Sequence, residues 1–153
     1  MKLKHKGKIE LVEPSEDIKG SYLIKSQSNI ESAKMLLNAE KFEESISLAY
    51  YSMYNCIMAL FFKCGIKCEN HSGSIIIFNR LFKQKELANI IELGKKKRID
   101  TQYYTNSNIS SQDCESIIRN ADFFNLECKN LIKRLNPEKI SSLREELAEA
   151  LSF

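Results

Sequence analysis

Residues 42–65 read FEESISLAYYSMYNCIMALFFKCG, and this stretch decides the fold. Its apolar residues recur every three or four positions, which is the spacing of one face of an α-helix. The residues on that face are Ile46, Ala49, Tyr50, Met53, Tyr54, Ile57, Leu60 and Phe61. Further apolar residues widen the face beyond one stripe, as in a helix that is buried on several sides. Gly65 accepts the left-handed conformation common just past a helix end, so we predict a long central helix that closes at Cys64 and Gly65.

A helix is also predicted before this stretch. Ser15 can cap it by accepting from free backbone N–H groups, and the acidic Glu16 and Asp17 suit the positive end of the helix dipole. The polar residues near position 38 should end this helix at about Asn38. A second helix therefore precedes the central one and is long enough to pack along it.

The most regular helical stripe lies near the end of the chain. Residues 110–113 can cap it, and its apolar residues follow helical spacing with almost no break. They are Cys114, Ile117, Ile118, Ala121, Phe124, Cys128, Leu131, Ile132 and Leu135. Asn136 and Pro137 should end this helix and start a short carboxy-terminal one, because proline fits the first turn of a helix.

The middle of the chain allows more than one interpretation. The run Ile75–Phe78 suits a short buried strand by propensity, but a lone strand would have no partner, so we predict a helix over 71–82. A short helix over 86–93 should follow and lead to Gly94 and a basic run. Residues 100–111 are rich in Asn, Ser, Thr and Tyr and lack periodicity, which predicts a long polar loop. Such loops often carry function.

Composition agrees with a single all-α domain. The length of 153 residues suits one domain. The sequence has 5 Gly and 2 Pro, which are few turn-forming residues for the many turns of an all-β fold. We expect an up-and-down bundle of four or five helices, with a basic amino-terminal arm over 1–14 and a carboxy-terminal helix over 137–153. We recognise no leader sequence and no run of the roughly 20 apolar residues that a membrane helix needs, so no membrane association and a cytoplasmic location are expected.

Charge and cysteine content narrow the function classes. The formal net charge of +3 is too small to indicate nucleic-acid binding by itself, but its distribution is uneven. One basic cluster lies at the amino terminus and comprises Lys2, Lys4, Lys6 and Lys8. The 5 cysteines lack C-x-x-C spacing, which argues against a zinc site and against a complete disulfide framework. We expect no metal and no cofactor.

Two groups of polar residues near helices are candidate sites. Tyr51, Tyr54 and Asn55 present polar tips beside the apolar face of the central helix, although tyrosines with hydroxyls at the rim of a core give the same pattern. His71 opens the next predicted helix. A histidine at that position caps or packs more often than it catalyses.

A third candidate group combines cations with aromatic rings. It comprises Lys95, Lys96, Lys97, Arg98, Tyr103 and Tyr104. Guanidinium groups pair bidentately with phosphate oxygens, and tyrosines stack on unpaired bases, so the group suits single-stranded nucleic acid or a nucleotide. A solvated turn with Tyr103 packed inwards is the alternative.

Together these segments resemble the HEPN (higher eukaryotes and prokaryotes nucleotide-binding) superfamily, particularly its small stand-alone prokaryotic members encoded beside nucleotidyltransferases. The resemblance runs from about residue 13 to residue 135. It rests on Glu13-Pro14-Ser15, Ala49 to Tyr54 with Ala59-Leu60, His71-Ser72, Arg98 followed by Gln102-Tyr103, and Ala121 with Phe124.

The resemblance implies a helical bundle that forms a homodimer, with a metal-independent ribonuclease site at the dimer cleft. Members use an Arg-x(4–6)-His motif; Arg98 matches the arginine, and Tyr103 stands at the histidine position. These two residues are the catalytic candidates, with activity weakened because tyrosine, whose pKa is about 10, is a poor base at pH 7. The candidates for binding RNA or a nucleotide are Lys95, Lys96, Lys97, Arg98, Tyr104, His71, Tyr51 and Asn55.

Two functions remain open at this point. The first is a component of a toxin–antitoxin pair that binds RNA or a nucleotide and cleaves RNA without a metal. The second is a non-catalytic interaction module that binds a partner nucleotidyltransferase. In that second case Tyr103 or Tyr104 would be the residue that the partner modifies.

Overall fold

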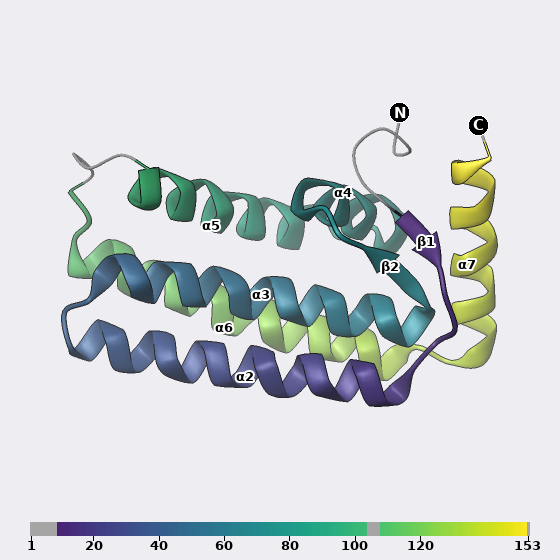
Figure 1. The fold of residues 1–153 in the computed structure, drawn as a ribbon, viewed down its shortest axis with the longest axis horizontal. Helices are drawn as coiled ribbons and strands as arrows, with labels where there is room; N and C mark the ends of the chain where they lie inside the picture. The colour runs from purple at the N-terminus through teal and green to yellow at the C-terminus, as the bar shows by residue number, and fades with distance from the viewer. Residues whose placement is uncertain (1–8, 104–107, 153) are drawn as a thin grey trace.

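Helices form almost all of the computed structural model, which describes residues 9–103 and 108–152 (Figure 1). The elements in chain order are β1 (Ile9–Leu11), α2 (Glu16–Asn38), α3 (Phe42–Cys64), β2 (Ile66–Cys68), α4 (His71–Phe82), α5 (Lys85–Tyr103), α6 (Ser111–Arg134) and α7 (Pro137–Leu151). The predicted all-α bundle is confirmed. It has six helices in the described residues rather than the four or five that we expected.

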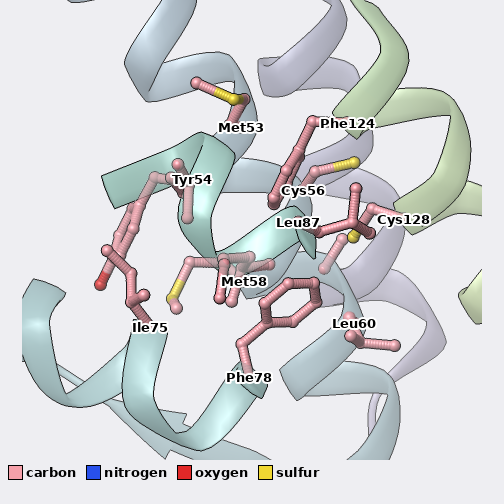
Figure 2. Close-up of a cluster of buried hydrophobic side chains, with 14 of the residues drawn as sticks. Met53, Tyr54, Cys56, Met58, Leu60, Ile75, Phe78, Leu87, Phe124 and Cys128 are labelled. Carbon is pink, nitrogen blue, oxygen red and sulfur yellow. The ribbon is translucent and has the colours of Figure 1, made fainter. Parts of the chain in front are cut away.

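Helix α3 is the centre of the bundle. It packs against α2, α5 and α6, and Figure 1 shows α5 along one side of α3 and α2 along the other. Figure 2 shows the core around it, where side chains of α3 meet Phe78 from α4, Leu87 from α5 and Phe124 from α6. Because α3 is enclosed in this way, its side chains reach neighbours from most of the chain.

Helix α3 is long and apolar enough to cross a membrane by length and composition, although it contains no uninterrupted run of about 20 apolar residues. In the fold, however, 78% of its most apolar window is buried inside the protein. Its apolar character is therefore accounted for by its place in the core.

Several predicted helix ends are confirmed. Ser15 caps α2 by accepting a hydrogen bond from the first turn, and Gly65 closes α3 with a φ of 71°. Ser110 and Asp113 cap α6 reciprocally, and Pro137 is the first residue of α7. The helix predicted over 71–82 is also confirmed.

The sequence prediction is wrong for α5. We expected a helix over 86–93, an interruption at Gly94 and a polar loop over 100–111, but one helix runs through the basic run to Tyr103. Gly94 does not break this helix; it lies buried where α5 touches α3. Residues 104–107 of the expected loop lie outside the described residues.

The first 14 residues include a short strand that the sequence did not predict. Part of the basic arm is strand β1, which pairs antiparallel with β2 so that Ile9 lies opposite Cys68 and Leu11 opposite Ile66. Its partner β2 lies directly between the end of α3 and the start of α4. Strands of this length contain too few residues to show an alternating pattern, which is why periodicity did not reveal them.

Helix α7 is attached to the end of α3 through one arginine. Nη1 of Arg144 donates to the carbonyl oxygens of Val12, Cys64 and Gly65 at 2.8, 3.0 and 2.9 Å. These carbonyls lie just after β1 and at the end of α3, so the contact joins three parts of the chain. Figure 1 shows α7 lying across one end of the bundle, far from the carboxy-terminal end of α5.

Candidate functional site

Arg98 on α5 lies over the rings of two tyrosines of α3. Its guanidinium carbon is 5.2 Å from the ring centroid of Tyr50 and 5.4 Å from that of Tyr51, which are cation–π distances. Gly94 lies one turn earlier and allows this approach, because a Cβ there would lie 2.9 Å from Cε of Met53 and 3.7 Å from Cδ1 of Tyr50. Close helix packing, rather than a loop, positions Arg98.

One donor of Arg98 is buried without an acceptor among the described residues. Nη1 donates to Oε1 of Gln102 at 2.8 Å, whereas the buried Nε has no acceptor among the described residues. A buried donor without a partner costs roughly 1–3 kcal/mol. A small movement of the side chain that brought Nε to the oxygen of a bound anion would remove that cost.

His71 lies beside the same tyrosines at the start of α4. Its Nδ1 is 2.8 Å from the hydroxyl oxygen of Tyr50, and its ring stacks on Tyr54 with centroids 3.8 Å apart and an angle of 10° between the planes. Asn70 caps α4 by accepting from the backbone N–H of Gly73 at 2.7 Å, which sets where the helix begins. His71 is therefore held from two sides.

The surroundings of His71 keep it uncharged. Burial lowers the pKa of His71 below its ordinary value, and the charges of Arg98 and Lys95 lower that pKa further. Burial raises the pKa of Tyr50 well above its usual value, against the effect of Arg98, which lowers it. Both groups are neutral at pH 7. A neutral imidazole has one nitrogen that can accept a proton.

Of the three lysines in the basic run, one joins this group. Nζ of Lys95 donates to Oγ of Ser72, the residue after His71, at 2.5 Å. Successive helical residues point about 100° apart, so Lys96 and Lys97 project in other directions. Lys96 is exposed and Lys97 partly exposed. Their proposed role in binding remains a prediction.

Tyr103 lies apart from these contacts. It is in the last turn of α5 with 69% of its surface exposed, so the alternative in which it packs inwards is wrong. Among the described residues no ring contact joins Tyr103 to Tyr50 or His71. Its catalytic role stays a prediction, and Tyr104 lies outside the described residues.

A pocket of about 580 Å³ adjoins the histidine. It lies between α2 and α3 and is bounded by the start of α4, with Tyr51, Asn55 and His71 in its wall. Nδ2 of Asn55 donates to Oδ1 of Asn29 on α2 at 2.7 Å. Tyr51 thus borders the pocket and also contacts Arg98.

The structure places five of the predicted site residues next to one another: Arg98, Lys95, His71, Tyr51 and Asn55. Sequence reasoning did not select Tyr50, which links Arg98 to His71, although the spacing of Tyr50 and Tyr54 puts both on one helix face. Nothing in the sequence indicated Asn29, because its partner Asn55 is brought to it only by helix packing.

Cysteine, histidine and acidic residues form no evident metal centre in the part of the chain that the structure describes. There, no group of three or more such side chains is placed to hold an ion. All 5 cysteines are buried free thiols. The expectation of a site without metal or cofactor stays a prediction.

Comparison with known proteins places this site in a family context. The family model for the HEPN domain matches residues 21–131, which contain Arg98, His71 and the tyrosines of α3. A protein of Methanocaldococcus jannaschii named "Putative toxin MJ0142" is 26% identical over 123 residues, which is 73% of this chain and 84% of that protein.

Two proteins named UPF0332 are also similar. One from Pyrococcus horikoshii is 34% identical over 82 residues, which is 54% of this chain and 52% of that protein. One from Thermotoga maritima is 33% identical over 66 residues, which is 43% of this chain and 49% of that protein. The matched regions thus span about half the length of these two relatives.

Proposed function

The chain belongs to the HEPN domain family, and from that premise we propose that it is the RNA-binding component of a toxin–antitoxin pair, with metal-independent ribonuclease activity. The observation that carries this proposal is the guanidinium of Arg98 held over Tyr50 and Tyr51 beside the neutral His71. The name of the Methanocaldococcus relative supports the toxin part of it.

Arg98 is the phosphate-binding group in this proposal. A guanidinium can donate two parallel hydrogen bonds to phosphate oxygens, and its charge is permanent. The side chain is already ordered by the tyrosine rings and by Gln102, so little conformational entropy is lost on binding. Lys95, also on α5 and bonded to Ser72 at the start of α4, adds a second positive charge.

His71 is the candidate base. Cleavage without a metal requires that the 2′-hydroxyl lose its proton to a base while its oxygen attacks the adjacent phosphorus; the bond to the 5′-oxygen then breaks as that oxygen gains a proton. A neutral imidazole suits the first transfer at pH 7 better than the exposed phenol of Tyr103. His71 therefore supplies the imidazole that the sequence motif lacks at position 103, although it comes from a different part of the chain.

We propose that the chain is a cytoplasmic homodimer and that its RNA-cleavage site lies at the dimer cleft. Helix α5 exposes two large apolar side chains, Leu93 at 65% and Tyr103 at 69%. A second copy of the chain would remove them from water, and such a contact would lie on the helix that carries Arg98. Neither a metal nor a cofactor is needed in this proposal.

The direct test is RNA affinity as a function of salt. Arg98→Ala should weaken binding at least tenfold and reduce the slope of log affinity against log salt by about 1, because one phosphate contact is lost. Arg98→Lys keeps the charge without the planar fork and should recover part of the affinity. Arg80→Ala, at an exposed arginine of α4, is the control. An unchanged slope for Arg98→Ala would refute the phosphate contact.

The exposure of Tyr103 favours a second candidate function, a non-catalytic module that binds a nucleotidyltransferase. Its hydroxyl oxygen would attack the α-phosphorus of ATP, lose its proton and release pyrophosphate. Co-expression with a candidate partner should then produce an AMP adduct that mass spectrometry detects and that Tyr103→Phe removes. An unmodified chain that still cleaves RNA would leave only the first function.

A further inference from the structure

The pocket between α2 and α3 has the composition of a site for a nucleobase. Aromatic rings line it from α2, α3 and α4, namely Tyr22, Tyr51, Tyr54 and His71. Its volume of about 580 Å³ lies within the range of small-molecule sites. We propose that this pocket takes one unpaired base of the bound RNA; the inference rests on the proposed function, since Arg98 would hold the neighbouring phosphate.

The side-chain amides of Asn55 and Asn29 can form hydrogen bonds with the edge of a base in the pocket. Asn55, only 9% exposed, donates from Nδ2 to Oδ1 of Asn29 at 2.7 Å. Each amide has both donor and acceptor atoms, so this bond leaves the acceptor Oδ1 of Asn55 and the donor Nδ2 of Asn29 for another molecule. Neither atom has another partner among the described residues. If both amides rotate together, one donor and one acceptor still remain.

A donor beside an acceptor is the complement of a Watson–Crick edge. Every base presents adjacent donor and acceptor atoms on that edge, and in a duplex they are occupied by the opposite strand. Proteins that read RNA by sequence bind these edges on unpaired bases stacked against aromatic rings. The pocket therefore fits single-stranded RNA and excludes a paired base.

The pocket and the phosphate group share one wall. The ring centroid of Tyr51 lies 5.4 Å from the guanidinium carbon of Arg98, and Tyr51 also borders the pocket. On the other side Tyr22 stacks on Phe62 with centroids 5.5 Å apart, which holds its ring in place. A nucleotide with its phosphate at Arg98 would thus meet an ordered aromatic surface next to it.

The test compares a short RNA with a strand of equal length that lacks every base, both carrying 2′-O-methyl groups so that no 2′-hydroxyl can attack. Fluorescence anisotropy with the full chain should show at least about tenfold tighter binding of the base-bearing strand, as expected from stacking one base. Asn29→Ala should reduce this preference, because the edge contact is lost while stacking remains, and should bind the abasic strand as the wild type does. Asn120→Ala, at an exposed asparagine of α6, should keep it.

Other outcomes overturn the inference in distinct ways. Equal binding of both strands by the wild type, weakened in both by Arg98→Ala, would refute the base pocket and leave the phosphate contact standing. No binding of either strand would refute the base pocket and the proposed function together. A preference in Asn29→Ala equal to that of the wild type would refute the role of the amide pair.

Discussion

At the scale of single residues, the site depends on a histidine that the fold keeps uncharged. His71 is held by Tyr50 and Tyr54 and faces the charges of Arg98 and Lys95 from α5. Protonation would place a third positive charge in the same group and in partly buried surroundings. Neutral His71 is thus a consequence of packing and of its cationic neighbours together.

This state predicts a dependence of stability on pH. The unfolded chain binds a proton at His71 near pH 6.5, whereas the folded chain binds it only at lower pH. The free energy of unfolding should therefore fall as the pH drops from 7 through 6.5, and this contribution should level off below the folded pKa. Urea unfolding at pH 7 and pH 5 should show a larger loss for the wild type than for His71→Gln.

Acidic groups also titrate in that interval, but they are the same in both proteins and cancel in the difference. Equal losses in the two proteins would mean that the pKa of His71 is not lowered in the folded state.

Local patterns identified Arg98 and His71 separately, and only the family resemblance placed them in one binding group. Arg98 was found through its place in a basic run, and His71 through its place before an apolar helix. The residue that connects them, Tyr50, looked like any other core position of α3. The connection arises from contacts between residues far apart in the sequence, so no local sequence pattern predicts it.

At the scale of helices, the approach of α5 to α3 places Arg98. Gly94→Leu should force the two helices apart, because a Cβ already meets Met53 at 2.9 Å. We expect a loss of about 1–3 kcal/mol in the free energy of unfolding and weaker RNA binding, since Arg98 would leave the tyrosine rings. Urea unfolding and RNA affinity measure the two effects.

Gly94→Ala is the matched control. The flexible end of Met53 can move away from one methyl group, and alanine favours a helix over glycine by about 1 kcal/mol. Its stability should stay within about 1 kcal/mol of the wild type, with RNA affinity retained. If Gly94→Leu bound RNA as well as Gly94→Ala, close helix packing would not be what positions Arg98.

Helix ends were predictable where local chemistry determines them. Ser15, Ser110 and Pro137 act on their own turns, so their roles can be read directly from the sequence. Strand β1 and the full length of α5 were not predictable in that way. The strand needs its distant partner β2, and Gly94 is favourable inside α5 only because α3 lies against it.

At the scale of the whole molecule, the proposed dimer should depend on the exposed surface of α5. Leu93→Asp would place a charge in that interface, so analytical ultracentrifugation should show a shift from dimer towards monomer. Met35→Asp, at a residue of α2 that is 70% exposed, should leave the dimer intact. A dimer that Met35→Asp disrupts and Leu93→Asp does not would place the interface on α2 instead.

The most direct measurement is cleavage of a mixed RNA pool by the purified chain in EDTA, beside Arg98→Ala, His71→Ala and Tyr103→Phe. The account predicts metal-independent cleavage by the wild type, loss of at least about a hundredfold with Arg98→Ala or His71→Ala, and activity retained in Tyr103→Phe. Cleavage that survives His71→Ala but is lost with Tyr103→Phe would contradict the assignment of the base. No cleavage by an intact dimer would contradict the ribonuclease itself.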